Sequence, residues 1–537
     1  MTVAKAGAPE GPSRVSASSG EAPVPRVGPT NRLAGLAGAF VLGVTPLLAA
    51  GQWPGVAAGS RLDAEDGIVT TRHEIPLDGR TLSYTARAGL IPIRDNATGE
   101  AHGSMFFISY ALDDAPGGGP RPLTFLWNGG PGSSSSLVHL LGFGPKRIGA
   151  DGEVLPNDGT WLDATDLVFV DPVGTGYSRP TAKEHAAEFY QNRGDAESVA
   201  ELIRVYLTRA DAWDAPLFLA GESFGVMRAT RVADVLQRRG IPVAGMIHIG
   251  LVPRLAPIDA ELETALAVPT YAATALHHGR LPADLARDFD SALRDARAWA
   301  ADTYAPALAR RGSLGEAERR ELLAALSRWT GVDAARAADS TLEIGIGAFA
   351  EGLLADQGLV VGRYDSRLTG PLDPSQTMYD PTTDPSLRDI IDDVAVVRYM
   401  RDELEYRSDL AYQGPFGGGY PSPERPRGDW MSVQWDWSES TRARVDDQTS
   451  DARPAVERVL RADEDVRVFV ACGYYDLVCS YAVIDEMLAR MDPALAGRVT
   501  VRTYHGGHAV YTDGEARRAM RADVSGFIRE TVAGAGR

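Results

Sequence analysis

The stretch that decides the fold is GESFG at residues 221–225, which follows the apolar run PLFLA at 216–220 and precedes VMRATRVADVL at 226–236. An apolar run that enters G-x-S-x-G and continues as a helical pattern predicts a strand, a sharp turn and a helix. Such a turn strains the backbone of its serine, and the small residues beside it let the strand and the helix approach closely. The stretch therefore places Ser223 as an exposed nucleophile at the start of a helix. Because the chain contains 57 glycines, this motif needs support from the rest of the sequence.

The length and the charge of the chain narrow its class. A chain of 537 residues exceeds one ordinary hydrophobic core, which predicts a large insertion in a catalytic domain or a second domain. The net charge of −18 argues against nucleic acid or an anionic membrane surface as the main partner. The two cysteines, Cys472 and Cys479, form no zinc-binding pattern, and whether they are bonded to each other stays open. The sequence implies no metal and no organic cofactor.

The N-terminal residues predict an exported protein. Residues 1–32 are rich in Ala, Gly, Pro and Ser without an apolar period, which predicts disorder. Residues 33–50 (LAGLAGAFVLGVTPLLAA) contain no charge, follow Arg26 and Arg32, and lead into small residues up to position 59. The segment 33–59 is typical of a secretory signal, which predicts a secreted or extracytoplasmic protein. A membrane anchor formed by residues 33–50 is the alternative, because such a run nearly spans a bilayer.

Beyond residue 66 the sequence alternates between strand-like and helix-like patterns. Residues 80–88 and 103–112 alternate apolar and polar residues, which predicts an antiparallel edge of a sheet. Later apolar runs predict buried strands at 123–127, 167–170, 217–220, 246–249, 466–471 and 499–504. Because helix-like segments separate these runs, we expect a mostly parallel sheet flanked by helices, which together with the serine turn is the α/β-hydrolase fold.

A different pattern fills residues 257–461. Strand-like runs nearly vanish there, and helical periods dominate at 260–277, 283–310, 315–329 and 386–406. Residues 364–379 and 414–437 are rich in Gly, Pro and aromatic residues, which is typical of loops. We expect a core made of residues 66–256 and 462–537, with 257–461 as a large helical lid inserted between core strands. Such a lid would roof the active site and limit the size of the substrate.

Two further residues complete a catalytic triad with Ser223. In a hydrolase of this topology an acid and then a histidine follow the serine, each on a loop after a strand. The predicted strand before CGYYD places Asp476 as the acid, and the predicted strand before HGGHA places His508 as the base. The imidazole takes the proton of the serine hydroxyl, and the carboxylate fixes the tautomer of the imidazole. The alternatives are a turn-capping Asp476 and His505 as the base, although His505 is expected to pack at the strand end.

A glycine-rich stretch supplies a place for the negative charge that develops during acyl transfer. NGGPG at 128–132 directly follows the predicted strand at 123–127 and precedes the serine in the chain. Glycine lets a backbone amide approach an oxyanion without a Cβ in the way. We expect the amide of Gly130 to be one donor and the amide of Phe224 to be the other. A simple turn is the alternative use of these glycines.

Five motifs occur in the order found in one enzyme family. They are NGGPGSS at 128–134, DPVGTGYS at 171–178, GESFG at 221–225, DLVC at 476–479 and GGH at 506–508. On these motifs the chain resembles the serine carboxypeptidase family, as a divergent bacterial-type member, over residues 70–255 and 465–537. The resemblance implies an α/β-hydrolase fold, the triad described above, and a peptide substrate from which C-terminal residues are removed, often at acidic pH.

The resemblance also assigns residues to the substrate. In the family, the glutamate before the nucleophile and the asparagine of N-G-G-P-G bind the terminal carboxylate, which implies this role for Glu222 and Asn128, with Gly129 beside them. A glutamate binds a carboxylate only if one of the two keeps a proton, because two like charges in contact repel each other. Cys479 matches a cysteine that lines the substrate pocket in the family, while a small buried residue is an equally good interpretation.

The chain departs from the family pattern at several positions. It has Leu126 where the family commonly has Trp, Ser133 where the family has a disulfide-bonded Cys, and Gly142 where it commonly has Glu. Arg228, which follows the elbow, is interpreted as a carboxylate anchor or as a surface group. In the family, the glutamate at the position of Gly142 shares a proton with the residue that Glu222 matches. Because this partner is missing here, strict carboxypeptidase specificity stays open, and an esterase or acyltransferase on the same triad is the alternative. An inactive binding module would require a broken triad.

Overall fold

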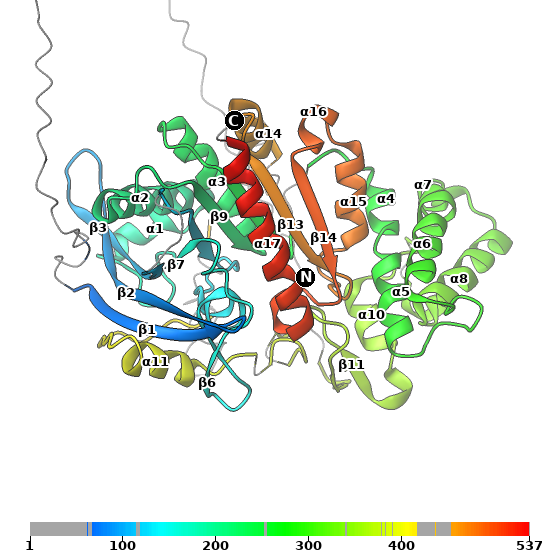
Figure 1. Cartoon of the computed structure of the whole chain (residues 1–537). Coiled ribbons are helices and arrows are strands. Elements are labelled where there is room, and N and C mark those ends of the chain that lie inside the picture. Colours follow the sequence, from blue (N-terminus) through cyan, green and yellow to red (C-terminus); the bar gives the residue numbers. More distant parts are fainter. Residues whose placement is uncertain are drawn as a thin grey trace, which may run out of the picture. The chain divides into compact units, whose positions relative to one another are not determined.

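A mixed sheet of ten strands forms the centre of the protein in this computed structural model (Figure 1). Its strands are β1 (Val69–Leu77), β2 (Arg80–Arg94), β3 (Ala101–Leu112), β4 (Leu123–Trp127), β7 (Asp166–Asp171), β8 (Arg179–Pro180), β9 (Leu217–Glu222), β10 (Gly245–Ile249), β13 (Arg467–Gly473) and β14 (Val499–Tyr504). In spatial order they run β1-β2-β3-β7-β4-β9-β10-β13-β14, and β8 pairs with β3. The structure describes residue 62 and residues 67–113, 119–251, 255–338, 341–376, 379–381, 383–388, 390–415, 435–436 and 453–535.

The sheet has an antiparallel end and a parallel end. Strands β1, β2, β3 and β7 pair antiparallel, whereas β7, β4, β9, β10, β13 and β14 run parallel to one another. Each stretch predicted as a strand lies in this sheet, and the predicted α/β-hydrolase fold is confirmed. Strand β1 was not predicted, because only Ile75 and Leu77 of its nine residues are buried and the apolar signal is weak.

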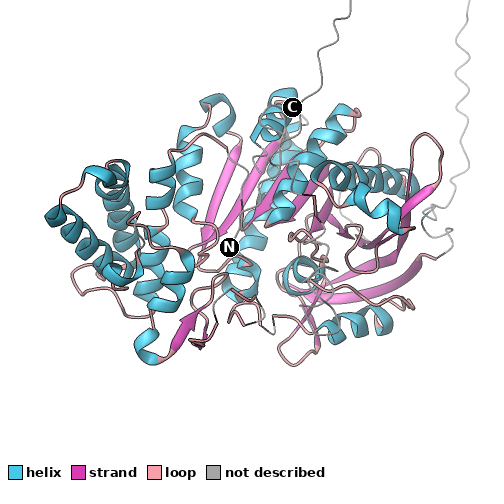
Figure 2. Cartoon of the chain, turned by 180° about the vertical axis from the view of Figure 1, so that it is seen from behind, coloured by secondary structure: helices cyan, strands magenta, loops and turns pink. Residues whose placement is uncertain are grey.

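Successive residues of the central strands face two different cores. Leu219 and Val470 pack into one core, whereas their neighbours Phe218 and Phe469 pack into the other, as the two-residue period of a strand requires. The first core is covered by α2 (Asn192–Ala210), α3 (Phe224–Arg238), α14 (Arg453–Ala462) and α15 (Tyr481–Arg490), and the second by α17 (Gly514–Ala535). Figure 2 shows these helices around the strands from behind. Shorter elements are β5 (Lys146–Ile148), β6 (Val154–Pro156), η2 (Val138–Phe143), η3 (Lys183–His185), α1 (Ala186–Phe189), α16 (Pro493–Ala496) and η8 (Val510–Thr512).

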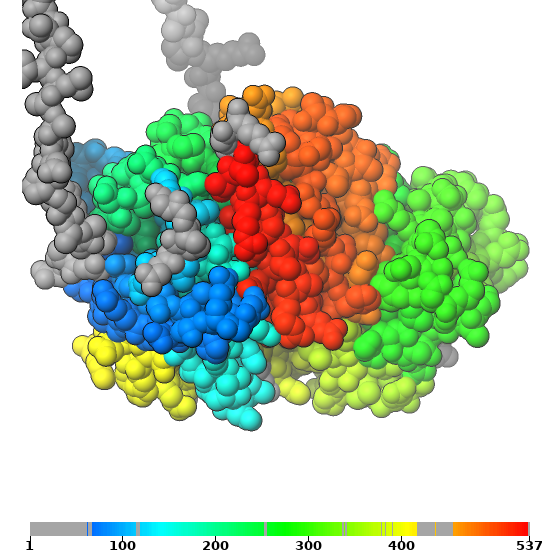
Figure 3. Space-filling model, viewed as in Figure 1, coloured from blue at the N-terminus to red at the C-terminus, as the bar shows by residue number. Residues whose placement is uncertain are grey.

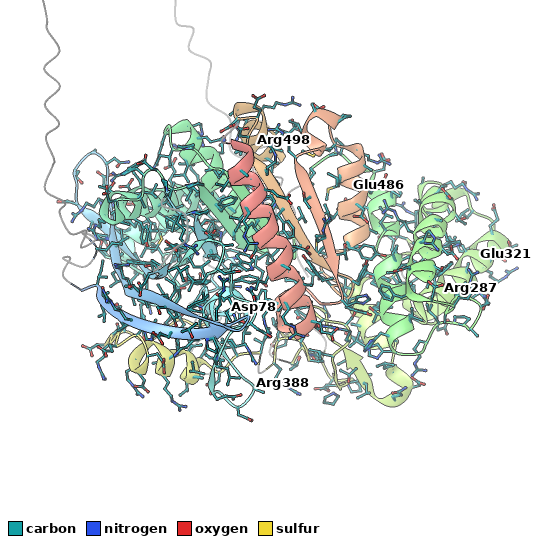
Figure 4. All side chains as sticks on the ribbon, in the orientation of Figure 1. Asp78, Arg287, Glu321, Arg388, Glu486 and Arg498 are labelled. Atoms are coloured by element: carbon teal, nitrogen blue, oxygen red, sulfur yellow. The ribbon has the colours of Figure 1, made fainter. Side chains whose placement is uncertain are left out.

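Helix α17 connects the last part of the chain to the antiparallel end of the sheet. It lies at the surface between the N-terminal strands (blue) and the β14 and α15 segment (orange) in Figure 3. Arg521 of this helix donates to Asp78 at 2.7 Å and to Asp163 at 3.0 Å, and Asp78 is labelled at the end of β1 in Figure 4. The final helix therefore holds the β1–β2 turn as well as covering the second core.

The segment predicted as a helical lid contributes to two regions of the protein. Its first helices are α4 (Ala260–Ala265), α5 (Val268–His277), α6 (Phe289–Trp299), η4 (Ala300–Tyr304), α7 (Ala305–Ala309), η5 (Arg311–Ser313), α8 (Glu316–Thr330), α9 (Ala334–Ala337), α10 (Ile346–Gly352) and η6 (Ala355–Gln357), which lie beside α15 in Figure 1. Helix α11 (Asp393–Asp402) lies instead at the antiparallel end of the main sheet, and the hydroxyl of its Tyr399 is 2.9 Å from that of Tyr110 on β3. Between them, β11 (Leu359–Val361) and β12 (Thr369–Pro371) form a small sheet that the sequence did not predict.

Local sequence features explain where the predicted helical stretches break. The stretch 260–277 divides into α4 and α5, with Pro269 near the start of α5. The stretch 386–406 contains only α11, which begins after Asp392, because the carboxylate of this residue accepts a hydrogen bond from Val394 N at 2.8 Å. The expected domain boundary at 461–462 falls at the last residues of α14, which packs on α3 of the core.

Several predictions fall on residues that the structure does not describe. The extension 1–32 and the signal-like segment 33–59 lie outside the described residues, as does most of the loop predicted at 414–437. In the parts of the chain that are described, no helix is both long and apolar enough to cross a membrane. Cys472 and Cys479 are not joined in a disulfide, so the bond that the sequence left open is not formed.

Candidate active site

Ser223 lies in the turn between β9 and α3. Strand β9 ends at Glu222 and α3 begins at Phe224, so the serine is the single residue between them. Its backbone has φ 55° and ψ −130°, a conformation that residues with a Cβ adopt only under strain. The turn requires glycine, because a Cβ on Gly221 would lie 2.0 Å from the carbonyl oxygen of Gly225. The GESFG pattern thus forms a strained turn in which Ser223 lines a cavity.

Asp476 and His508 meet beyond the ends of β13 and β14. Oδ2 of Asp476 accepts a hydrogen bond from Nδ1 of His508 at 2.6 Å, and Oδ1 accepts from the amides of Val478 (2.8 Å) and Cys479 (3.0 Å). Because Nδ1 donates to the carboxylate, the lone pair of the neutral imidazole is on Nε2, which is buried and has no hydrogen-bond partner among the described residues. His508 lines the same cavity as Ser223, an arrangement that suits a base and its nucleophile.

Two opposing effects act on the protonation of His508. Burial disfavours the charged imidazolium and lowers the pKa, whereas the charge and hydrogen bond of Asp476 and the charge of Glu222 raise it. The result is that the pKa of His508 is raised above its ordinary value. The imidazolium that forms when a serine proton is transferred is therefore stabilised by two carboxylates.

The glycine-rich stretch after β4 lies directly against the serine turn. A Cβ on Gly129 would lie 2.6 Å from the amide nitrogen of Phe224 and 2.8 Å from the Cβ of Ser223, so only glycine fits there. Gly130 has φ +105°, which also favours glycine, and it lines the cavity. The amide of Phe224 belongs to the first turn of α3, where amides have no carbonyl partner within the helix. The two amides predicted as oxyanion donors therefore belong to segments in contact, and their role stays a prediction.

Glu222 and Asn128 face each other in the cavity. Nδ2 of Asn128 donates a hydrogen bond to Oε2 of Glu222, while the amide of Val138 donates to Oδ1 of Asn128 at 3.1 Å and thereby fixes the orientation of this side chain. The hydroxyl of Tyr511 donates to the same Oε2 at 2.9 Å. Burial raises the pKa of Glu222, even though these donors and the charge of His508 lower it.

Tyr511 occupies the space beside Gly142. A Cβ on Gly142 would lie 3.3 Å from Cγ of Tyr511, and the tyrosine ring also meets Phe143 edge-on at 5.1 Å. The resemblance led us to expect a missing partner for Glu222 at position 142, and the phenol of Tyr511 fills that role from another part of the chain. Sequence reasoning missed this residue, because Tyr511 and Glu222 are 289 positions apart and no local pattern indicates their hydrogen bond.

Arg228 is buried on α3, so its interpretation as a surface group was wrong. Its Nε donates to Oδ2 of Asp195 at 2.7 Å, and its Nη1 donates to the backbone carbonyl of Asn128 at 2.9 Å. It is not among the described residues that line the cavity, which also removes the interpretation as a carboxylate anchor. The ion pair instead holds the end of β4, from which Asn128 and Gly129 extend.

The cavity has a volume of about 450 Å³ and two different walls. The core wall includes Asn128, Gly129, Gly130, Glu222, Ser223 and His508. The other wall comes from the inserted segment and consists of Tyr364, Asp365, Leu368, Pro381, Pro385, Ser386, Leu387, Arg388, Ile390 and Pro415. Arg388, labelled in Figure 4, is the cation of this largely apolar wall. The described residues of helices α4 to α10 contribute nothing to it, so the inserted loops, rather than the inserted helices, border the site.

The inserted loop also touches the base directly. The backbone carbonyl of Tyr364 accepts a hydrogen bond from the amide of His508 at 2.6 Å, and the ring of Tyr364 meets the imidazole edge-on at 5.3 Å. Tyr364 was not singled out from the sequence, because its loop was recognised only by its composition. Its carbonyl helps to set the position of His508.

Two residues weighed from the sequence lie beside the site and not in the cavity. Cys479 packs against the first core, and it is not among the described residues that line the cavity, which favours its interpretation as a packing residue. His505 packs near Phe289 and Tyr474, with ring centroids 4.6 Å and 5.2 Å away. This placement agrees with the packing role expected of His505.

One group of possible metal ligands occurs among the described residues, and none of its members lines the cavity. It consists of His102, His185 and Glu188, with Nδ1 of His102 at 2.9 Å from Oε2 of Glu188. The two imidazole rings are stacked, with centroids 4.0 Å apart and planes 16° apart. Since a metal lies near the plane of each imidazole that binds it, two stacked rings cannot share one ion in this arrangement. We assign no metal to the group.

Comparisons with known proteins extend the sequence resemblance. Residues 77–239 match the sequence profile of the serine carboxypeptidase family. The pheromone-processing carboxypeptidase KEX1 of Saccharomyces cerevisiae is 41% identical over 95 residues, which are 17% of this chain and 13% of that protein. The KEX1 protein of Fusarium vanettenii is 28% identical over 195 residues, which are 36% of this chain and 30% of that protein. A solved prohormone-processing carboxypeptidase from S. cerevisiae aligns with 83% of this chain and 91% of its own, at 15% identity and a TM-score of 0.48.

The matching part of the chain contains most of the first core segment. Residues 77–239 include the glycine-rich stretch after β4, the serine turn and α3. The alignments span 13% and 30% of the length of the two curated relatives. Over this core segment, the chain is similar to the serine carboxypeptidase family.

Proposed function

We propose that the protein is a serine-type carboxypeptidase that hydrolyses C-terminal peptide bonds through an acyl-enzyme intermediate. The observation that carries this proposal is the hydrogen bond between Asp476 and His508. It leaves Nε2 of His508 as the acceptor, and this buried atom has no hydrogen-bond partner among the described residues. His508 lines the same cavity as Ser223. The match of residues 77–239 to the serine carboxypeptidase family supports the same reaction class.

The reaction has two halves. Oγ of Ser223 attacks the carbonyl carbon of the last peptide bond while Nε2 of His508 takes the hydroxyl proton, and the amides of Gly130 and Phe224 donate to the oxyanion. His508 then gives this proton to the departing amino group, and the C-terminal amino acid leaves. Water repeats the sequence on the acyl-enzyme, which releases the shortened peptide and restores the serine hydroxyl.

Selection of a free C-terminus requires a group that recognises a carboxylate. Asn128 and Glu222 are the proposed recognition pair, with Gly129 supplying the close backbone approach. Because burial raises the pKa of Glu222, the side chain holds a proton over a wider range of acidic pH than an exposed glutamate. The protonated form can donate a hydrogen bond to the substrate carboxylate without placing two negative charges in contact.

We also propose that the protein is exported. The uncharged run at 33–50 and the small residues that follow support this location, and peptide substrates are compatible with it. N-terminal sequencing of protein recovered from the culture medium, compared with protein from the cell membrane fraction, separates a cleaved signal from a retained anchor.

One comparison of substrates checks the proposed reaction. Release of the last amino acid from an N-blocked dipeptide is compared with release from the same dipeptide amidated at its C-terminus, from acidic to neutral pH. A carboxypeptidase prefers the free acid strongly, and Ser223→Ala abolishes the release. Equal or absent cleavage of both peptides, with retained turnover of an ester, would move the assignment to an esterase or acyltransferase.

A further inference from the structure

Tyr511 lies on the loop that carries His508, and its hydroxyl contacts Glu222, which is proposed to bind the C-terminal carboxylate of the substrate. It belongs to η8, three residues after His508, and it is fully buried. Its hydroxyl donates to Oε2 of Glu222 at 2.9 Å, and its ring lies against Gly142, where a Cβ would be 3.3 Å from Cγ. A buried phenol and a buried carboxylate are thus paired in a place where the ring cannot easily move away.

The donors around Glu222 act on one of its two oxygens. Both Tyr511 and Asn128 donate to Oε2, so this oxygen serves as an acceptor with two partners. When Glu222 takes up a proton, Oε1 is the oxygen left to carry it, and that proton can be donated to a ligand in the cavity. Oε2 can keep both hydrogen bonds in either state, but both bonds are stronger to the ionised form.

We propose that Tyr511 is a specificity-determining residue, which holds Glu222 as an acceptor through its hydroxyl and thereby sets the pH above which peptides with a free C-terminal carboxylate lose affinity. The inference rests on the proposed carboxypeptidase function, because it concerns recognition of the terminal carboxylate. In this proposal the phenol of Tyr511 tunes the protonation of Glu222, the last residue of β9.

The other groups around Glu222 fix the sign of the effect. Burial raises the pKa of Glu222 most, and the charge of Asp476 raises it as well. The charge of His508 and the hydrogen bonds of Tyr511 and Asn128 lower it, because they favour the ionised form. The charge of Glu222 in turn raises the pKa of the nearby Tyr364 phenol. Removal of the Tyr511 hydroxyl therefore favours the protonated Glu222.

The variant Tyr511→Phe has a counterintuitive expected result. A substrate carboxylate binds the protonated Glu222, so KM for a free-acid peptide rises as pH rises and Glu222 ionises. Without the phenol, Glu222 keeps its proton to higher pH, and the rise in KM should move upward by about one pH unit, as a lost hydrogen bond to a charged group predicts. At a pH on the rising limb, KM of the variant would be up to about tenfold lower than that of the wild type.

The experiment measures KM and kcat between about pH 4 and pH 8, a range that begins near the ordinary pKa of a glutamate and extends upward because burial raises the pKa of Glu222. An N-blocked dipeptide acid is compared with the corresponding ester, which lacks a terminal carboxylate. Tyr511→Phe should shift the KM profile of the acid alone, whereas Tyr271→Phe, which removes a buried phenol in the inserted helices, should shift neither. In Glu222→Gln the KM profile of the acid should be flat, and adding Tyr511→Phe to it should change nothing further.

Each outcome decides the proposal. Parallel KM profiles for the wild type and Tyr511→Phe, in proteins with equal thermal stability, would overturn it while leaving the carboxypeptidase assignment intact. A shift to lower pH would overturn it too, because the hydroxyl would then favour the protonated form of Glu222 and not the ionised form. If the wild type does not prefer the acid over the amide at any pH, the proposed function itself fails, and the role of Tyr511 fails with it.

Discussion

Glu222 and His508 line the same cavity, and the charge of each shifts the pKa of the other. The ionised carboxylate of Glu222 raises the pKa of His508, and the charged imidazolium lowers the pKa of Glu222. Glu222 directly precedes the nucleophile, whereas His508 follows β14, so the coupling joins substrate recognition to the base. Because a substrate carboxylate binds protonated Glu222, the negative charge near this position in the complex is that of the substrate.

This coupling predicts the effect of Glu222→Gln on the acid limb of turnover. His508 must be neutral to accept the serine proton, so kcat falls as pH drops through its pKa. Removal of the Glu222 charge lowers that pKa, and the fall in kcat should move to lower pH by about one unit or less. The measurement uses an ester without a terminal carboxylate, so that changes in carboxylate binding do not enter. An acid limb that stays in place or moves to higher pH would contradict the coupling.

Replacement of the acid by its amide should disable the base. Oδ1 of Asp476 accepts from two backbone amides and Oδ2 accepts from Nδ1 of His508, so three donors surround one carboxylate. In Asp476→Asn the amide group must face one set of these donors. If the NH2 group of the asparagine faces His508, Nδ1 becomes the acceptor and Nε2 carries the hydrogen. An Nε2 atom that carries a hydrogen cannot take the serine proton.

We therefore expect Asp476→Asn to lower kcat by about 10⁴-fold, the size of effect known for loss of the correct tautomer in a serine triad. Turnover of an ester and the thermal unfolding curve are measured together, because the variant should remain folded. A loss smaller than about tenfold would show that the hydrogen bond at 2.6 Å does not fix the tautomer.

A single methyl group at Gly129 should separate the oxyanion donors. Its Cβ would lie 2.6 Å from Phe224 N and 2.8 Å from the Cβ of Ser223, and no flexible side chain can give way at the backbone contact. A displacement of about 1 Å costs about 100-fold in rate, so Gly129→Ala should lower kcat by at least that factor. Gly526→Ala is the matched control, because its Cβ meets nothing within 4 Å on α17. Equal kcat values for both variants would remove the donor role of this segment.

The parts of the fold and of the site that could be predicted are those that depend on residues close together in the sequence. Short runs of neighbouring residues indicate the strand at Leu217–Glu222 and the glycines of the serine turn. Together with the order of the motifs, they allowed the parallel sheet and the positions of Ser223 and His508 to be predicted. The break at Asp392 is also local, but a side-chain cap decided it against a longer helical pattern.

The features that escaped prediction depend on contacts between distant residues. Tyr511 and Glu222 are 289 positions apart, and no pattern near either of them indicates the hydrogen bond. Arg228 looked like an ordinary surface residue of a helix until the fold brought Asp195 of α2 against it. The inserted loop that carries Tyr364 has no periodicity, so its position over the base could not be inferred from its composition.

Loss of Asp195 should destabilise the whole protein. Arg228 is fully buried and pairs with Asp195 at 2.7 Å, so Asp195→Ala leaves a guanidinium without its counter-ion. Breaking a buried pair in this way costs about 3–5 kcal/mol, which urea unfolding measures directly. Glu197→Ala on the same helix removes a partner from the exposed Arg193 pair and should cost no more than about 0.5 kcal/mol. Similar losses in the two variants would show that the buried pair contributes no more than an exposed one.

Replacement of Arg228, the other member of the ion pair, should make the free energy of unfolding depend more strongly on pH. Burial already raises the pKa of Asp195 in the presence of Arg228, and Arg228→Met removes the charge that opposes this effect. The folded variant then holds a proton that the unfolded chain releases above about pH 4, so its stability falls as pH rises. The urea midpoint should therefore drop more between pH 5 and pH 8 in Arg228→Met than in the wild type, and the double variant Asp195→Asn with Arg228→Met should lose this extra drop. Equal pH dependence in the wild type and Arg228→Met would mean that Asp195 reaches water when its partner is gone, and that the pair holds Asn128 less firmly than its burial implies.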